Sequence, residues 1–366
     1  MFAASITANM KKLLFFLFPL TAFTQKNSNS RFEEIMLRQK NFSGVLLVAE
    51  NGKHVYHKAF GYRDFEKQIL LKKNDLFELA SVSKQFTAMI ILMLQEKGLL
   101  NYDDEVEKYL NIPYKGITIR HLLTHTSGLP DYQAIMDQYW DKTKVAGNKE
   151  ILEYLNKYAP PKNAEPGTKY EYSNTGYVLL ASIAEKVNGK EFIKLCRQWI
   201  FGPLKMKKTN IRTLEQKASA KHFAIGHVYV KEKDQYIRAD SFPSSNYTIW
   251  LGNRKGPGRV SSTALDLLKW DKALYTDKLL KQSTLEEAFK PMKLNNDSLS
   301  LYGFGWMLKQ DPAMGKIVHH TGDNPGYKTH IIRYIEKNKT IILLSNNAHE
   351  KFEAVIKEIE KIIREQ

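Results

Sequence analysis

The chain has 366 residues, of which 43% are hydrophobic and 26% charged, as in a globular protein of one composite domain or two domains. The single cysteine, Cys196, excludes an internal disulfide framework and a cysteine-rich metal site, and its apolar helical surroundings predict a buried, inert thiol. The net charge of +16 favours anionic surfaces, but the lysines are scattered, so we interpret the excess as a solvated basic surface and expect no nucleic-acid partner.

Residues 1–29 are interpreted as a leader and signal peptide. Lys11 and Lys12 form a basic region, and the apolar run that follows, residues 13–23, is too short to span a bilayer. Met10 is an alternative start. This pattern predicts an exported protein, periplasmic or secreted, with no stable membrane span once the signal is removed. An uncleaved apolar segment is the alternative interpretation.

A β-hairpin follows the expected start of the mature chain near residue 30. Two β-type runs, residues 42–50 and 53–61, are joined by Asn51-Gly52, the strongest short signal for a hairpin turn. The middle of the chain has mostly helical patterns. The helices expected there span residues 85–97, 117–123, 148–158 and 177–187.

Strands return in the last third of the chain, after a helix over residues 264–275 that begins behind the cap Ser261-Ser262-Thr263. The expected strands are residues 305–309, 316–320, 327–335 and 340–345, and an amphipathic helix at residues 352–363 closes the chain. We therefore predict an α/β (α+β) fold with an antiparallel sheet built from both termini and flanked by helices. Its α/β part covers about residues 30–80 and 211–366, and a mostly helical inserted part covers about residues 81–210.

Ser81-Val82-Ser83-Lys84 opens the first of these helices. A serine three residues before a lysine lies about one turn away, with Cβ atoms roughly 5–6 Å apart. A serine hydroxyl needs an adjacent base to become a nucleophile, and lysine serves as that base only if burial lowers its pKa from about 10.4. The helix that follows is apolar nearly all round, which predicts such burial. The alternative is a serine N-cap beside a solvated lysine.

A second stretch of interest is Tyr172-Ser173-Asn174, expected on a loop before the helix at residue 177. A tyrosine with a pKa near 10 acts as a base at neutral pH only beside a cation, which Lys84 could provide. Asn174 offers hydrogen-bond donors and an acceptor to a substrate amide. The alternative is a packed tyrosine followed by a helix-capping asparagine.

The third stretch, His319-His320-Thr321-Gly322, lies on an expected strand. Gly322 would let a substrate backbone approach closely, and His320 could donate a hydrogen bond to a substrate carbonyl or carboxylate. Paired histidines also suggest a metal, but the spacing places no third ligand, so we expect no metal and no other cofactor. A purely structural strand-end histidine is the alternative.

The three stretches together, Ser81-x-x-Lys84, Tyr172-Ser173-Asn174 and His320-Thr321-Gly322, resemble in this order the signature elements of the serine β-lactamase and penicillin-binding protein superfamily. The tyrosine version is similar to the class C β-lactamase branch, which includes D-alanyl-D-alanine carboxypeptidases, D-aminopeptidases and esterases. Residues 119–130 look like that branch's helix-and-loop segment. The resemblance covers about residues 32–363.

This resemblance implies a role for each element. Ser81 would be the acylated nucleophile, Lys84 would take its proton, and Tyr172 would relay protons to the leaving group and activate the deacylating water. The backbone N–H groups of Ser81 and Asp323 would form the oxyanion hole. The substrate-binding residues implied are Asn174, His320, Thr321 and Gly322.

Two departures from the family pattern bear on the substrate. His320 stands where many β-lactamases have lysine, and a mostly neutral histidine attracts a substrate carboxylate less strongly. Arg259, in Gly256-Pro257-Gly258-Arg259, replaces part of a run of glycines. It could supply the missing positive charge, but we favour a surface arginine.

We therefore expect an exported serine hydrolase, a monomer whose partner is a small-molecule or peptide substrate, possibly from the cell wall. A D-alanyl peptide or an ester is favoured as the acyl donor. A β-lactamase is the alternative within this class. A non-catalytic cell-wall peptide binder and a basic protein that binds nucleic acid or membrane surfaces are the alternatives from other classes.

Overall fold

The computed structural model describes residues 18–365, with side chains from residue 28 onward. Most of the predicted signal region therefore lies outside the described residues. Helix α1 (Phe18–Arg38) runs through the expected start of the mature chain near residue 30, and the boundary of the signal peptide stays a prediction. No helix in the described part of the chain has the length and apolar character needed to cross a membrane.

The described residues divide into two compact units, one made of residues 18–40 with 353–365 and the other of Asn41–Phe352. Within the first unit, α1 is joined to the closing helix α12 (Phe352–Arg364) by two ion pairs, Arg31–Glu365 at 2.5 Å and Arg38–Glu358 at 2.9 Å. The predicted apolar face of α12 is buried, as expected for an amphipathic helix.

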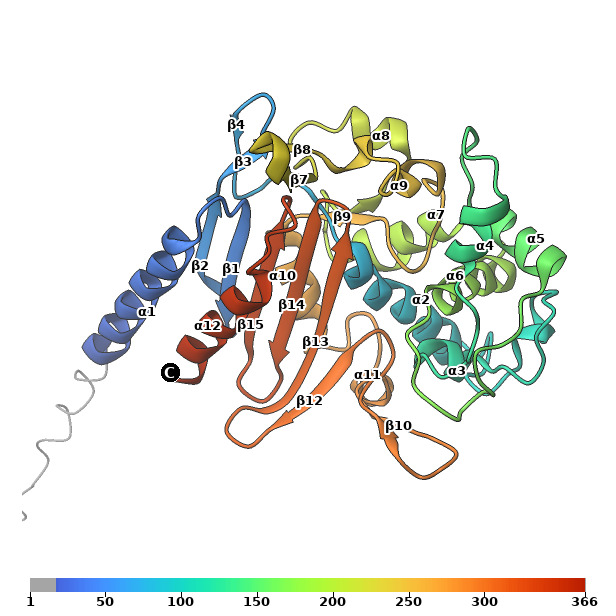
Figure 1. The fold of residues 1–366 in the computed structure, drawn as a ribbon. Helices are drawn as coiled ribbons and strands as arrows, with labels where there is room; N and C mark the ends of the chain where they lie inside the picture. The colour runs from blue at the N-terminus through green and yellow to red at the C-terminus, as the bar shows by residue number, and fades with distance from the viewer. Residues whose placement is uncertain (1–17, 366) are drawn as a thin grey trace, which may run out of the picture. The chain divides into compact units, whose positions relative to one another are not determined.

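The second unit is built around a six-stranded antiparallel sheet with the strand order β12-β13-β14-β15-β1-β2 (Figure 1). The strands are β1 (Gly44–Glu50), β2 (Lys53–Phe60), β12 (Met307–Asp311), β13 (Gly315–Asn324), β14 (Tyr327–Tyr334) and β15 (Lys339–Ser345). Val45 of β1 lies opposite Leu344 of β15, so strands from the two ends of the chain meet in the middle of the sheet. The predicted antiparallel sheet built from both termini is confirmed.

The turn between β1 and β2 follows its sequence signal. Asn51 and Gly52 both have positive φ angles, +49° and +68°, as a type I′ hairpin turn requires. Helix α10 (Ala264–Ala273) packs on β1 and β15. Beneath it, the buried guanidinium of Arg333 donates to Asp271 at 2.6 Å, which fixes α10 to β14.

Helices fill the middle of the second unit, and Figure 1 shows them gathered away from β1 and β2. They are α2 (Lys84–Glu96), α3 (Ile119–Leu123), α4 (Tyr132–Tyr139), α5 (Asn148–Tyr158), α6 (Asn174–Asn188) and α7 (Phe192–Cys196). The α+β fold class is thereby confirmed, while the division into an α/β part and an inserted helical part stays a prediction.

Short elements complete the described chain. They are β3 (Tyr62–Asp64), β4 (Ile69–Leu70), β5 (Phe77–Glu78), the 3-10 helix η1 (Ala80–Ser83), β6 (Asn210–Ile211), α8 (Leu214–Ala218), β7 (His227–Val230), β8 (Gln235–Arg238), α9 (Tyr247–Trp250), β9 (Val260–Ser262), α11 (Gln282–Ala288), β10 (Met292–Lys293) and β11 (Leu299–Ser300).

Some predicted boundaries were wrong by two or three residues. Helix α6 begins at Asn174 and not at residue 177, because the Ser173 hydroxyl accepts from the Gly176 N–H and caps the helix there. Strand β12 begins at Met307, since Gly305 takes a φ of +80° that a strand does not adopt. Cys196 is fully buried and burial raises the pKa of its thiol, in agreement with an inert cysteine.

Candidate active site

Ser81 lies in η1, directly before the buried helix α2. The preceding residue, Ala80, is buried and has a φ of +49°, a left-handed conformation that is rare for a residue with a Cβ atom. Leu79 is held from two sides: its N–H donates to the Val260 carbonyl and its own carbonyl accepts from Thr329 Oγ1, each at 2.8 Å. This fixed backbone presents a partly exposed Ser81 at the start of α2.

Lys84 is fully buried, so the alternative of a solvated lysine is wrong. Its Nζ lies 3.0 Å from Ser81 Oγ, 2.9 Å from Asn174 Oδ1 and 3.0 Å from the Pro257 carbonyl. Burial, reinforced by the charge of Arg254, lowers the pKa of the Lys84 amine well below its ordinary value of 10.5. A neutral amine has two hydrogens for the Asn174 and Pro257 oxygens and one lone pair for the Ser81 hydroxyl.

Tyr172 meets this pair from the middle of the chain. The Nζ of Lys84 lies 4.7 Å from the centroid of the Tyr172 ring. Although Tyr172 is 37% exposed, desolvation of its phenol raises the pKa, and a hydrogen bond with Ser81 offsets only part of that rise. The phenol is therefore protonated at neutral pH and can give a proton, while Lys84 is the base of the group.

Asn174 occupies the first position of α6, where its Oδ1 accepts from Lys84. The cap of this helix is Ser173, so the interpretation of Asn174 as the capping residue is wrong. The side-chain N–H₂ of Asn174 has no hydrogen-bond partner among the described residues. These donors are available to the carbonyl of a bound amide or ester.

His320 is buried on β13 with both ring nitrogens engaged inside the protein. Nδ1 lies 2.6 Å from the Thr321 carbonyl and Nε2 lies 2.7 Å from the Tyr302 hydroxyl. Since a carbonyl only accepts, Nδ1 carries the proton and Nε2 accepts from Tyr302. Burial, followed by the charge of Lys84, lowers the pKa of His320 to about 3, so the ring is neutral at pH 7. Hydrogen bonding of His320 to a substrate stays a prediction.

The strand β13 presents an unpaired edge beyond His319. β12 pairs with β13 as far as His319, which lies opposite Met307. On the other side, Asn324 lies opposite Tyr327 at the two-residue turn to β14, and bonded pairs alternate along an antiparallel ladder. The Asp323 N–H therefore points away from β14 to the edge that packs on η1, where an oxyanion donor would have to be.

Gly322 permits a close approach, but the neighbour differs from the one expected. A Cβ atom on Gly322 would lie 2.3 Å from the Leu79 carbonyl oxygen and 2.3 Å from Thr329 Oγ1. The glycine therefore lets β13 pack directly on the backbone that precedes Ser81. The substrate approach predicted for Gly322 is not what fixes the residue type in this structure.

Two arginines in the wall of the site are buried. The interpretation of Arg259 as a surface residue is wrong, because its side chain is enclosed and lies 3.7 Å from the Glu78 carboxylate. Arg254 is also buried and donates to the Tyr132 hydroxyl at 2.6 Å. Sequence analysis missed Arg254, Glu78 and Tyr132, since isolated polar residues in loops and helices carry no periodic signal.

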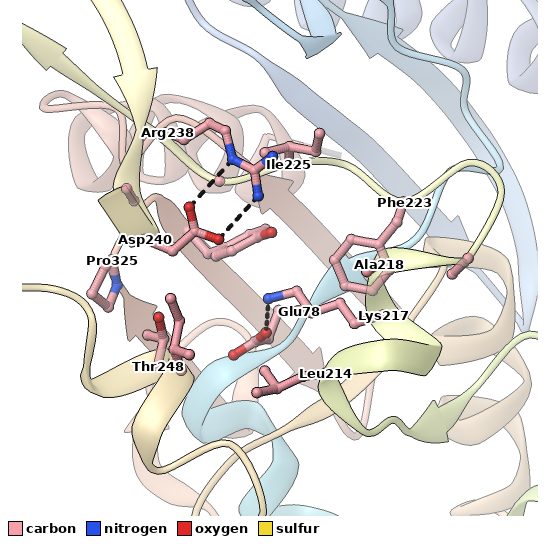
Figure 2. A pocket seen from close by; sticks show the side chains of 15 residues that line it. Glu78, Leu214, Lys217, Ala218, Phe223, Ile225, Arg238, Asp240, Thr248 and Pro325 are labelled. Carbon is pink, nitrogen blue, oxygen red and sulfur yellow. Dashed lines mark hydrogen bonds and ion pairs between the residues drawn. The ribbon is translucent and has the colours of Figure 1, made fainter. Parts of the chain in front are cut away.

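A cavity of about 380 Å³ has Glu78 in its wall (Figure 2). Glu78 and Pro325 line it, one shortly before Ser81 and the other shortly after Asp323. Lys217 donates to Glu78 at 2.6 Å, and Figure 2 shows this ion pair in the cavity. Desolvation opposes the charge of Glu78, but Lys217 and Arg259 outweigh it and lower its pKa to about 2.

The aromatic loop over residues 242–250 contributes to this cavity in part. Thr248 and Ile249 line the cavity, whereas Trp250 is buried in the core. The loop therefore both borders the cavity and adds to the core.

Comparison with known proteins agrees with the fold and the order of the motifs. A family model described as Beta-lactamase matches residues 29–362. Penicillin-binding protein 4* of Bacillus subtilis (strain 168) is 42% identical over 336 residues, which cover 90% of this chain and 74% of that protein. Protein flp of Staphylococcus aureus (strain N315) is 27% identical over 82% of this chain, and the chain spans 59% of its length.

A solved structure shows the same fold. The octameric penicillin-binding protein homologue from Pyrococcus abyssi superposes with a TM-score of 0.77 and 26% identity, over 93% of this chain and 77% of that one. The family model covers nearly all of the described residues, and the Bacillus subtilis relative is similar across most of the chain. The chain belongs to the Beta-lactamase family.

Proposed function

We propose that the protein is an exported serine hydrolase that forms an acyl-enzyme on Ser81 and acts on a peptide, an amide or an ester. The observation that carries this proposal is the 3.0 Å contact between Ser81 Oγ and the buried Nζ of Lys84. A buried amine with a lowered pKa is the base that an otherwise weak serine nucleophile requires.

In the acylation step, the neutral amine of Lys84 accepts the hydroxyl proton while Ser81 Oγ forms a bond to the substrate carbonyl carbon. The carbonyl oxygen becomes an oxyanion that the N–H groups of Ser81 and Asp323 stabilise. Removal of one such donor typically costs about 2.7–4 kcal/mol of transition-state stabilisation. The N-terminal end of α2 adds a favourable potential for this negative charge.

Breakdown of the tetrahedral intermediate requires a proton on the leaving group. Tyr172, a neutral phenol beside Lys84, gives that proton and regains one from the Lys84 ammonium. The bond to the leaving group breaks and the acyl group stays on Ser81. Water then attacks the acyl carbon while Tyr172 takes its proton and passes its own hydroxyl proton to Lys84. The bond between the acyl carbon and Ser81 Oγ breaks, and the Lys84 ammonium returns a proton to Oγ, which frees the serine.

The surroundings of His320 bear on the substrate class. A neutral His320 places no cation opposite a substrate carboxylate, which favours uncharged esters over rapid turnover of carboxylate-bearing β-lactams. The name of the Bacillus subtilis relative states that it binds penicillin, which supports an acyl donor of the β-lactam or D-alanyl type for this site. Export, to the periplasm or as a secreted protein, rests on the basic and apolar N-terminal pattern.

A substrate panel tests the proposal. Native protein and S81A are compared with p-nitrophenyl acetate, nitrocefin and D-alanyl-D-alanine peptides. We expect ester turnover and weak nitrocefin hydrolysis by the native protein, both absent from S81A. A nitrocefin rate typical of dedicated β-lactamases would favour the lactamase alternative, and equal peptide binding by both proteins without turnover would favour a non-catalytic binder.

A further inference from the structure

His125 lies directly against Tyr172 without belonging to the predicted set of site residues. It is fully buried in the loop after α3, and its ring centroid lies 4.2 Å from that of Tyr172. The same imidazole also contacts the ring of Tyr302, at 4.5 Å between centroids. His125 is therefore part of the wall against which the phenol rests.

The backbone on both sides of Tyr172 is bonded to this one residue. The Glu171 N–H donates to the His125 backbone carbonyl at 2.8 Å. The Ser173 N–H donates to His125 Nδ1 at 3.0 Å. One bond uses the main chain of His125 and the other uses its side chain, so the N–H groups of the residues before and after Tyr172 are held by a single neighbour.

The second bond determines the tautomer of the imidazole. Because Nδ1 accepts from a peptide N–H, the proton of the neutral ring is on Nε2. Nε2 is buried and has no hydrogen-bond partner among the described residues. Leaving a buried donor unpaired is unfavourable, so the contacts of this histidine serve something other than optimal stability. Burial lowers the pKa of His125 well below its ordinary value and keeps Nδ1 an acceptor.

We propose that His125 is a positioning residue for Tyr172, holding the backbone N–H groups of the residues on either side of it so that the phenol stays at Ser81 and Lys84. The inference rests on the proposed function, since it assigns His125 an effect only through proton transfer by Tyr172. A displacement of about 1 Å of such a group reduces a rate on the order of 100-fold.

The backbone conformation of His125 provides a matched pair of variants. Its φ of +57° is left-handed, a region that glycine and asparagine adopt most readily. H125N keeps this backbone and places an amide oxygen where Nδ1 accepts from Ser173. H125G keeps the backbone and has no acceptor. The difference between the two variants isolates the bond to the Ser173 N–H from backbone strain.

The test measures kcat and KM for p-nitrophenyl acetate, and the rate at which a fluorophosphonate labels Ser81. The variants compared are H125N, H125G, Y172F and the double variants H125N/Y172F and H125G/Y172F. H125G should lose kcat on the order of 100-fold with little change in KM, and H125N should stay within about tenfold of native protein. In the Y172F background the difference between Asn and Gly should vanish, because His125 then has no phenol to position. Thermal melting of each variant checks that it is folded.

The outcomes separate this inference from the proposed function. If Y172F is impaired but H125G matches native protein, or H125N is as impaired as Y172F, the role of His125 is overturned and the proposed function stands. The same holds if the Asn and Gly variants still differ in the Y172F background. If H125G does not fold, the rate of H125N decides: a rate within about tenfold of native protein supports the role of His125, and a rate as low as that of Y172F overturns it. If Y172F itself behaves as native protein, both the role of Tyr172 and that of His125 fail.

Discussion

The side-chain nitrogen of Lys84 lies 3.0 Å from the hydroxyl of Ser81, at a position closed to solvent. The three-residue spacing of Ser81 and Lys84 accounts for both the contact and the chemistry, because the helix that brings the two residues together also desolvates the Lys84 amine. Desolvation disfavours the ammonium form and makes the lysine a usable base. Measurements of stability and of rate should both report that lowered pKa.

The stability of the protein should depend on pH through Lys84. In the unfolded chain the amine keeps its proton up to about pH 10.5, whereas in the folded protein it loses the proton at much lower pH. Between these two values the unfolded state binds more protons, so the free energy of unfolding rises with pH. K84M lacks this group and should show a flatter curve. Urea unfolding at several pH values between 7 and 10 measures both, and parallel curves for the two proteins would refute a lowered pKa.

The backbone N–H of Asp323 should matter far more than its side chain. D323P removes this N–H without breaking the β13–β14 ladder, because the N–H points to the edge that β12 leaves unpaired. Loss of an oxyanion donor should reduce kcat by about 10²–10³-fold, while the control D323A should stay within a few-fold of native protein. Equal rates for D323P and D323A would remove Asp323 from the oxyanion hole.

The preference for a substrate with a free carboxylate should not change with pH through protonation of His320. Burial and Lys84 hold the pKa of His320 at about 3, so the imidazole stays neutral from pH 5 to pH 8. The comparison uses a D-alanyl peptide with a free carboxylate and the same peptide with a C-terminal amide. The value of kcat/KM for the first divided by that for the second should therefore stay constant over this pH range. A ratio that climbs several-fold as the pH falls through 6 would mean that His320 becomes charged and attracts the carboxylate.

The buried carboxylate of Glu78 should stabilise the protein. It accepts from Lys217 and Asn324, each at 2.6 Å, and lies 3.7 Å from Arg259, so E78Q leaves the buried Arg259 and the partly exposed Lys217 without their counter-charge. We expect a loss of about 3 kcal/mol of unfolding free energy at pH 7. Because the pKa of Glu78 is lowered from 4.5 to about 2, this stabilisation is present above pH 4.5 and disappears as the pH falls towards 2. Chemical denaturation at pH 7 and pH 3 measures it.

The exposed Glu232 offers a control for the Glu78 variant. E232Q should change stability by less than about 0.5 kcal/mol at either pH, as is usual for surface substitutions. A loss in E78Q no larger than that in E232Q would show that the ion pairs of Glu78 contribute nothing measurable.

Local patterns in the sequence predicted the elements that depend on neighbouring residues. Asn51-Gly52 makes the expected hairpin turn, and the hydroxyl of Thr263 caps α10 as predicted. The helix over residues 148–158 has the same bounds as α5. Caps, turns and amphipathic periods involve residues a few positions apart, so a single sequence is enough to identify them.

Features that depend on distant partners were predicted poorly. Arg259 was assigned to the surface because its counter-charge, Glu78, comes from a remote strand before η1. The contacts of His125 with the backbone around Tyr172 likewise join two loops that no periodicity connects. The order of the three motifs indicated which residues gather at the site, but the second layer of charges and rings around them depends on tertiary packing.

The most direct test of the account is the intact mass of the protein after reaction with a fluorophosphonate, followed by peptide mapping. We predict a single adduct on Ser81 that forms on native protein, is absent from S81A, and forms more slowly in K84M by about 10²–10⁴-fold, the usual contribution of a general base. An adduct on another residue, or labelling of K84M at the native rate, would contradict the assignment of Ser81 as the nucleophile and Lys84 as its base.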